Sequence, residues 1–230
     1  MPMTDNPAAL ALWMQLHDSA FPAGRMVHSN GFEEWLALHP CARGAEIEVC
    51  ALDYLTFAVA TLDATVTAAA WRATPSMVTL CELDTVLTSY KLTGNARSAS
   101  QTAGRQLAVT AQQVGLCSSD GYLTAVIAGS TPGNLAVVEG AVQAAIGVSV
   151  HTAVLGSLRS ALAAVLSAAV RLGRLGPLEA QRIQVRSVEG VVALADAACS
   201  RPLEEMASTT MQLEIAGMRH ENRSQRLFAS

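Results

Sequence analysis

The sequence predicts an all-α protein, and three properties of its 230 residues support this. Hydrophobic residues make up 51% of the chain and charged residues only 15%, so the chain can bury a large core and is not intrinsically disordered. Aromatic residues are only 4%, whereas 41 residues are alanine, the strongest helix former. Because strands favour aromatic and β-branched residues, packed helices are expected rather than a β-sandwich or barrel.

In the first half of the chain, apolar residues recur at helical spacing, and prolines and glycines separate the runs. Asn30 is expected to cap the second helix, with Glu33 at its third position as in a capping box. Asn95 is expected to cap the fifth helix. The predicted helices of this half cover residues 9–20, 31–38, 45–71, 77–92 and 95–113.

The second half shows the same spacing with more small residues. Gly156, Ser160, Ala164 and Ala168 recur every four residues, and such a stripe lets another helix approach closely, from the same chain or from a second copy. Pro177 suits the first turn of a helix. The predicted helices of this half cover residues 122–128, 134–147, 149–172, 177–198 and 203–218. Residues 1–230 are therefore expected to form one domain of about eight to ten helices.

Charge and cysteine content limit the possible partners and compartments. The net charge is −4, which does not favour a nucleic-acid-binding surface. The five cysteines are odd in number and form no C-x-x-C pair, so free thiols in a reducing compartment, the cytoplasm, are expected. The N-terminal residues lack the pattern of a signal peptide. The longest uncharged run, 140–158, is interpreted as buried helices and not as a membrane span.

The sequence lacks the motifs of several enzyme classes. It contains no G-x-x-x-x-G-K-[ST] motif, and Lys91, its one lysine, follows no glycine-rich loop. No G-x-S-x-G or H-E-x-x-H motif occurs, and the five histidines are never three or four residues apart. No catalytic residues, metal site or tightly bound cofactor are therefore expected.

Four segments, 16–34, 95–105, 170–182 and 218–230, combine charged side chains with turn residues. In the second segment Arg97 and Arg105 share one helical face. Gly104 in the middle of that helix costs about 1 kcal/mol relative to alanine, which indicates tight packing.

In this order the four segments resemble those of the urease accessory protein UreF family. The first matches its D-S-x-x-P-x-G and H-S-x-G-x-E patterns, although Arg25-Met26-Val27 replaces the usual residues after the Pro-x-Gly. The second resembles R-E-x-S-x-x-x-G-R-x-L, with Ser98 in place of the acid. The third keeps Arg171, Leu172, Pro177 and Gln181 of a glycine-rich turn, and the last matches M-R-H-E-x-x-x-x-R-L-F-x-S.

The resemblance implies an all-α, dimeric, non-enzymatic chaperone. Such a protein bridges UreD (UreH) and the GTPase UreG during metallocentre assembly. Nickel insertion into apo-urease then depends on GTP, and the nickel is in transit through the complex.

The same resemblance suggests roles for individual residues. The tail 219–230 is expected to be free of its own domain and to bind UreD. Its candidate contacts are Arg219, His220, Glu221, Arg223, Arg226, Leu227 and Phe228. Candidates for dimer or UreG contacts are Arg97, Arg105, Arg171, Gln181 and Arg182. Expected loop and cap residues are Asp18, Pro22, Gly24, His28, Asn30, Gly31 and Glu33.

Two alternatives remain open at this stage. The chain could be an all-α enzyme whose site is assembled from scattered residues such as Asp18, His28 and Glu33. It could also be a helical adaptor unrelated to urease.

Overall fold

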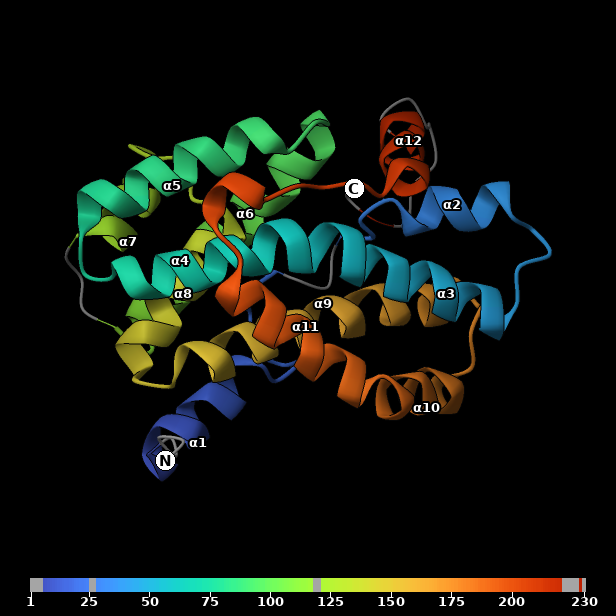
Figure 1. Ribbon diagram of the computed structural model, residues 1–230, viewed down its shortest axis with the longest axis horizontal. Helices are drawn as coiled ribbons and strands as arrows, with labels where there is room; N and C mark the ends of the chain where they lie inside the picture. Colours follow the sequence, from blue (N-terminus) through green and yellow to red (C-terminus); the bar gives the residue numbers. More distant parts are fainter. Residues whose placement is uncertain (1–5, 25–27, 118–120, 221–227, 229–230) are drawn as a thin grey trace.

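The computed structural model describes residues 6–24, 28–117, 121–220 and 228, and this part of the chain contains helices and no strands (Figure 1). The all-α prediction is confirmed. Because α3, η2 and α4 form one continuous helix, the described residues contain eleven helices apart from the short 3₁₀-helix η3, slightly more than the eight to ten predicted. The α-helices are α1 (Pro7–Leu16), α2 (Phe32–Leu38), α3 (Gly44–Tyr54), α4 (Ala64–Ala73), α5 (Met77–Tyr90), α6 (Gly94–Gln113), α7 (Tyr122–Ala128), α8 (Leu135–Ile146), α9 (Val150–Arg171), α10 (Pro177–Arg186), α11 (Val188–Ser200) and α12 (Met211–His220). A π-helix, η2 (Leu55–Asp63), joins α3 to α4, and a 3₁₀-helix, η3 (Leu203–Glu205), follows α11.

Two apolar cores lie on either side of a central pair of long helices. One member of the pair is the continuous helix Gly44–Ala73, and α9 packs against it. The first core is formed mainly with α2, α10, α11 and α12, and the second with α1, α5, α6, α7 and α8. Both long helices are apolar enough to span a membrane, but 56% and 61% of their apolar windows are buried in these cores. Figure 1 shows α2 and α12 at one end of the molecule and α5 and α7 at the other.

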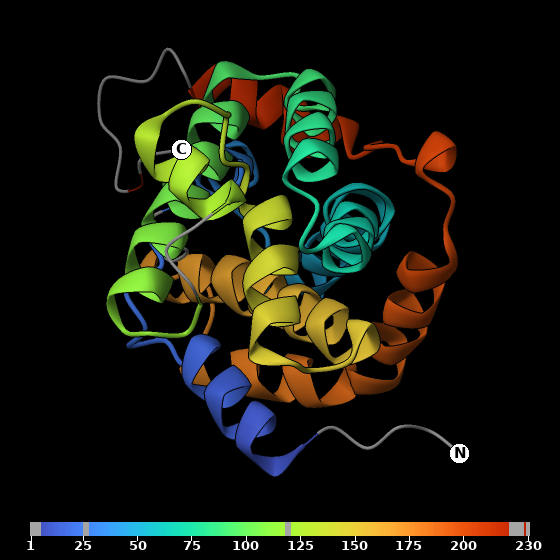
Figure 2. The same cartoon turned by 90° about the vertical axis from the view of Figure 1, so that its left-hand side faces the viewer.

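The small-residue stripe of α9 receives α1, which lies at the edge of the molecule (Figure 2). A Cβ atom added at Gly156 would lie 2.5 Å from His17 Nε2 and 2.8 Å from the ring of Trp13. Ser160 Oγ lies 2.8 Å from His17 Nδ1. Gln143 of α8 completes the contact, because its Oε1 accepts from Trp13 Nε1 and from His17 Nε2 at 3.0 Å each. At Gly156 and Ser160 the stripe therefore serves packing within the chain.

Gly104 is the point of closest approach between α6 and the start of α8. A Cβ atom at this position would collide with the backbone oxygen of Gly133 and would lie 2.8 Å from Leu135 N. The predicted tight packing is confirmed, and backbone atoms cannot move aside as a flexible side chain can.

Gly104→Ala is therefore expected to lower the free energy of unfolding by about 1–3 kcal/mol, as overpacked cores do. Gly190→Ala is the matched control, because Gly190 is also inside a helix but has no atom within 4 Å of an added Cβ. That change should raise stability by about 0.5–1 kcal/mol. Urea denaturation of both variants measures the difference, and equal effects would contradict the close approach.

The end of α1 and the start of α6 differ from the prediction, because side chains bind the backbone at both places. The first helix ends at Leu16 rather than at residue 20, and Asp18 Oδ1 accepts from Ala20 N at 2.7 Å to form a turn. The cap of α6 is Thr93, whose Oγ1 accepts from Ala96 N at 3.0 Å, so the prediction of Asn95 was wrong.

The predicted helix 177–198 is divided into α10 and α11 at Ser187. Ser187 lies between the two helices with φ −86° and ψ −2°, and its Oγ donates to the carbonyl of Gln184 at 3.1 Å.

The predicted helix 203–218 begins only at Met211, because the preceding residues pair with η2. Ala207 N donates to Thr61 O at 3.2 Å, and Thr209 N donates to Phe57 O at 2.9 Å. Thr61 Oγ1 returns a bond to Ala207 O at 2.6 Å. The widened π-turn thus anchors an extended segment that leads into α12.

Candidate partner-binding site

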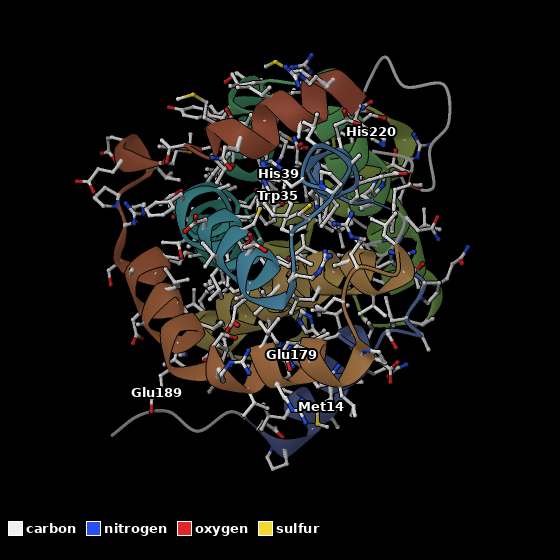
Figure 3. All side chains as sticks on the ribbon, turned by 90° about the vertical axis from the view of Figure 1, so that its right-hand side faces the viewer. Met14, Trp35, His39, Glu179, Glu189 and His220 are labelled. Carbon is white, nitrogen blue, oxygen red and sulfur yellow. The ribbon has the colours of Figure 1, made fainter. Side chains whose placement is uncertain are left out.

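Three of the four motif segments meet at the α2–α12 end of the molecule. The first contributes α2 with Glu33, the third contributes Arg171 at the end of α9, and the fourth contributes His220 and Phe228. Figure 3 shows His220 close to α2, which carries Trp35 and His39, and well separated from Glu189 on α11.

Glu33 has a different role from the predicted one. The N-cap of α2 is Gly31, with φ 84°, and it makes no side-chain cap hydrogen bond. The expected capping by Asn30, whose φ is 51°, was therefore wrong. Glu33 Oε2 instead accepts from His220 Nε2 at 3.0 Å and from the backbone N of Phe228 at 3.1 Å.

Gly31 explains why α12 comes so close to α2. A Cβ atom at Gly31 would lie 2.7 Å from the carbonyl oxygen of Leu213 in α12. A side chain at position 31 would therefore push α12 away, and its positive φ also favours glycine. The approach places His220, at the end of α12, next to Glu33.

The Glu33–His220 pair is almost fully buried, with exposed fractions of 7% and 0%. Because an ionised carboxylate can only accept, His220 Nε2 is the donor. Its Nδ1 has no hydrogen-bond partner within the described part of the chain. The pair therefore ties the end of α12 to α2 inside the first core.

Phe228 is also buried, with 3% of its surface exposed. The guanidinium of Arg171 lies over its ring, with Cζ 4.2 Å from the ring centroid, in a cation–π arrangement. Desolvation lowers the pKa of Arg171 from its usual value. The expectation that the tail is free of its domain is thus wrong at His220 and Phe228, because the chain supplies a carboxylate and a guanidinium that hold them.

The remaining tail candidates are less fully described. Arg219 is exposed at the end of α12. Glu221, Arg223, Arg226 and Leu227 lie outside the described residues.

Arg174 is a residue of this site that the sequence analysis did not single out. Its guanidinium donates to the carbonyls of Leu36 and His39 at 3.0 Å each and of Pro40 at 2.8 Å. These groups lie at the end of α2, where helix carbonyls lack partners within the helix. The sequence signal that could have identified Arg174 is its position in the glycine-rich turn 171–176, where no neighbouring acid could pair with it.

The arginines of α6 do not join this site. Arg97 donates to the carbonyls of Lys91 and Leu92, and Arg105 donates to the carbonyl of Ile127 at 2.6 Å. The other contact candidates, Gln181 and Arg182, are exposed on α10.

The loop after α1 packs against α6. Pro22 O accepts from Thr110 Oγ1 at 3.1 Å, and Gly24 has a φ of 72°. Beyond the loop, His28 is buried, and desolvation lowers its pKa below the usual 6.5.

This shift predicts a pH dependence of stability. Between pH 6.5 and the lower folded-state pKa, His28 takes up a proton in the unfolded chain but not in the folded one. The free energy of unfolding should therefore fall as the pH drops below 6.5. His28→Gln should make this decline shallower in urea titrations between pH 5 and 7.5. An unchanged slope would mean that His28 does not contribute.

A cavity of about 210 Å³ lies between η2, α6, α8, α9 and α12. On one wall Lys91 Nζ lies 2.7 Å from Asp63 Oδ1. The buried Glu139 lies on another wall, and His28 also lines the space.

Among the described residues, no three histidine, cysteine or acidic side chains are grouped as for a metal ion. Asp18, His28 and Glu33, the scattered site of the alternative enzyme hypothesis, are therefore not grouped in this way.

Comparison with known proteins identifies the family. A family model described as UreF matches residues 43–188. A urease accessory protein UreF of Corynebacterium efficiens is 31% identical over 222 residues, covering 94% of this chain and 95% of the relative. The UreF of Trichodesmium erythraeum is 29% identical over 233 residues, covering 99% of both chains. That of Bradyrhizobium diazoefficiens is 28% identical over 225 residues, covering 97% and 92%.

The family model covers more than half of the chain, and the relatives align along almost all of it. The resemblance seen in the four segments is confirmed: the chain belongs to the UreF family of urease accessory proteins.

Proposed function

We propose that this chain is a non-enzymatic chaperone that bridges UreD (UreH) and the GTPase UreG while nickel is incorporated into apo-urease. Family membership over nearly the full length carries the proposal. We further propose that it works in the cytoplasm.

UreD is proposed to bind at the α2–α12 end. Arg219 is exposed there, and the tail sequence adds Arg223 and Arg226. Arginine donates paired hydrogen bonds to carboxylates and is enriched among residues that dominate binding. Phe228, which follows these arginines in the sequence, is buried and so attaches this part of the chain to the domain.

A second surface is proposed for dimerisation or for UreG. On α10, Leu178 and Val185 are 72% and 73% exposed, beside Gln181 and Arg182. Exposed apolar side chains among polar ones are typical of protein interfaces. Sedimentation at micromolar concentration should give a dimer, and a species of only 24.0 kDa would contradict this part of the proposal.

Nickel is proposed to pass through the complex as cargo rather than to stay as a cofactor. His28, Asp63 and Glu139 line the cavity, and imidazole is the side chain among these that suits nickel. The proposal for the cargo itself comes from the family.

Reconstitution with purified components tests the whole proposal. The chain should co-purify with UreD and UreG, and apo-urease should gain activity only when the chain, both partners, nickel, bicarbonate and GTP are present. The chain alone should not hydrolyse GTP. GTPase activity that follows the chain through purification, or full activation of urease without it, would refute the proposal.

A further inference from the structure

Two of the three described residues of the tail are held by the same atom. His220 and Phe228 both donate to Glu33 Oε2, although seven residues separate them in the sequence. Arg223 and Arg226, two of the proposed partner contacts, lie between them in the sequence.

The Phe228 seat, which consists of Glu33, Arg171 and His220, contains two kinds of contact. Glu33 supplies a buried acceptor for the backbone N–H of Phe228. Arg171 supplies a cation over the ring, and the ring is buried. The backbone hydrogen bond to the buried carboxylate fixes the position of the chain at residue 228. The contact with the guanidinium favours an aromatic side chain there.

We propose that the Phe228 seat is a positioning site that preorganises the tail for its partner. Glu33 and Arg171 then set the affinity for UreD through Phe228, without a requirement to touch UreD. This inference rests on the proposed function of the tail and extends it to residues on α2 and α9.

The physical reason is the cost of ordering a chain. Each backbone residue fixed on binding costs about 1–2 kcal/mol. A segment attached at both ends has fewer conformations to lose than one attached at a single end, so less of the interaction energy is spent on ordering. Release of Phe228 should therefore weaken the complex even when every contact with the partner is still available.

The experiment compares variants of the full-length chain. Glu33→Gln removes the charge of the acceptor, and Arg171→Ala removes the cation over the ring. Glu189→Gln is the matched control, because Glu189 is exposed on α11 and distant from His220 (Figure 3). Circular dichroism and thermal unfolding confirm that each variant is folded at the assay temperature.

Two measurements are made on each variant. Hydrogen exchange of the isolated chain reports whether the Phe228 amide is protected. Titration with purified UreD gives the dissociation constant. Both seat variants should lose amide protection and bind UreD about tenfold more weakly, which corresponds to about 1.4 kcal/mol, whereas Glu189→Gln should change neither.

A double variant separates positioning from a purely structural role. If Glu33 acts through Phe228, Glu33→Gln should weaken binding no further in a chain that ends at residue 227, because that chain lacks both the backbone N–H and the ring of Phe228. Additive losses would show that Glu33 acts by another route and would overturn the proposal. Because Arg171 is exposed and outside the core, Arg171→Ala gives an answer even if Glu33→Gln is poorly folded.

Other outcomes are equally decisive. If the seat variants lose amide protection but bind UreD more tightly, the seat restrains the tail and opposes binding. If they bind UreD equally well, seating is irrelevant to the partner. If the unaltered chain fails to bind UreD, the proposed function fails, and the exchange data separately show whether the seat itself exists.

Discussion

Asp84→Ala is expected to lower the free energy of unfolding by about 4 kcal/mol or more, the largest effect of any single substitution considered. Asp84 is fully buried in α5. Its Oδ2 accepts from Tyr122 Oη at 3.0 Å, Thr131 Oγ1 at 2.9 Å and Gly133 N at 2.6 Å. Its Oδ1 accepts from the backbone N and the Nδ2 of Asn134, at 2.8 Å each.

The size of the effect follows from the donors that remain. Alanine at position 84 would leave several buried donors without an acceptor, and each such group costs about 1–3 kcal/mol. The same donors fix the connection between α7 and α8, which leads to the close contact at Gly104.

Urea denaturation measures this prediction, with Glu82→Ala as the control. Glu82 lies two residues away on the same helix and is exposed, so its removal should change stability by less than about 0.5 kcal/mol. Similar losses from the two variants would show that the carboxylate network contributes little.

Asp84 also shows how much of the fold the sequence could predict. Leu80, Leu83 and Leu87 mark the buried stripe of α5 by helical spacing, and Asp84 lies on that stripe. A carboxylate on a buried stripe indicates a buried hydrogen-bond network, although its donors, 38 to 50 residues later, leave no local pattern.

Helix positions were predictable because apolar spacing is a local property, whereas several ends were not. The start of α12 depends on bonds from Ala207 and Thr209 to η2, some 150 residues earlier. The break at Ser187 falls at neither a proline nor a glycine, so composition alone does not place it.

The candidate site was only partly predictable for the same reason. The motifs identified Glu33, His220 and Phe228 separately, but the Glu33–His220 bond joins residues 187 positions apart. Glu33 follows Asn30 by three residues, and a capping box is the local explanation for that spacing. In the structure Glu33 binds His220 of α12 instead. The partners of Arg174 were not predictable because they are backbone carbonyls, although its place in a glycine-rich turn was a signal for the residue itself.

Deletion of residues 219–230 is expected to have two effects: loss of UreD binding and a reduced free energy of unfolding. The sequence alone predicts that only the first occurs, since a free tail can be removed without harm. The buried positions of His220 and Phe228 predict the second as well.

The stability loss originates at Glu33. Truncation removes both donors to its Oε2 and removes the ring beneath Arg171, which leaves a buried carboxylate without these partners. Removal of one partner from a buried ion pair typically costs about 3–5 kcal/mol, and water that enters the vacated space reduces this cost.

A second substitution tests that cause directly. If the loss of the His220 and Phe228 donors at Glu33 is the source of the lower stability, Glu33→Gln in the truncated chain should recover part of the stability, whereas the same change in the full-length chain should reduce it. Thermal unfolding of the four proteins, paired with a UreD pull-down, measures both effects. Recovery of stability without recovery of binding would show that the tail has two separable roles, one in the fold through Glu33 and one at the partner. If the truncated chain unfolds at the same temperature as the full-length chain, the buried contacts of His220 and Phe228 do not stabilise the domain, and the tail acts only on its partner.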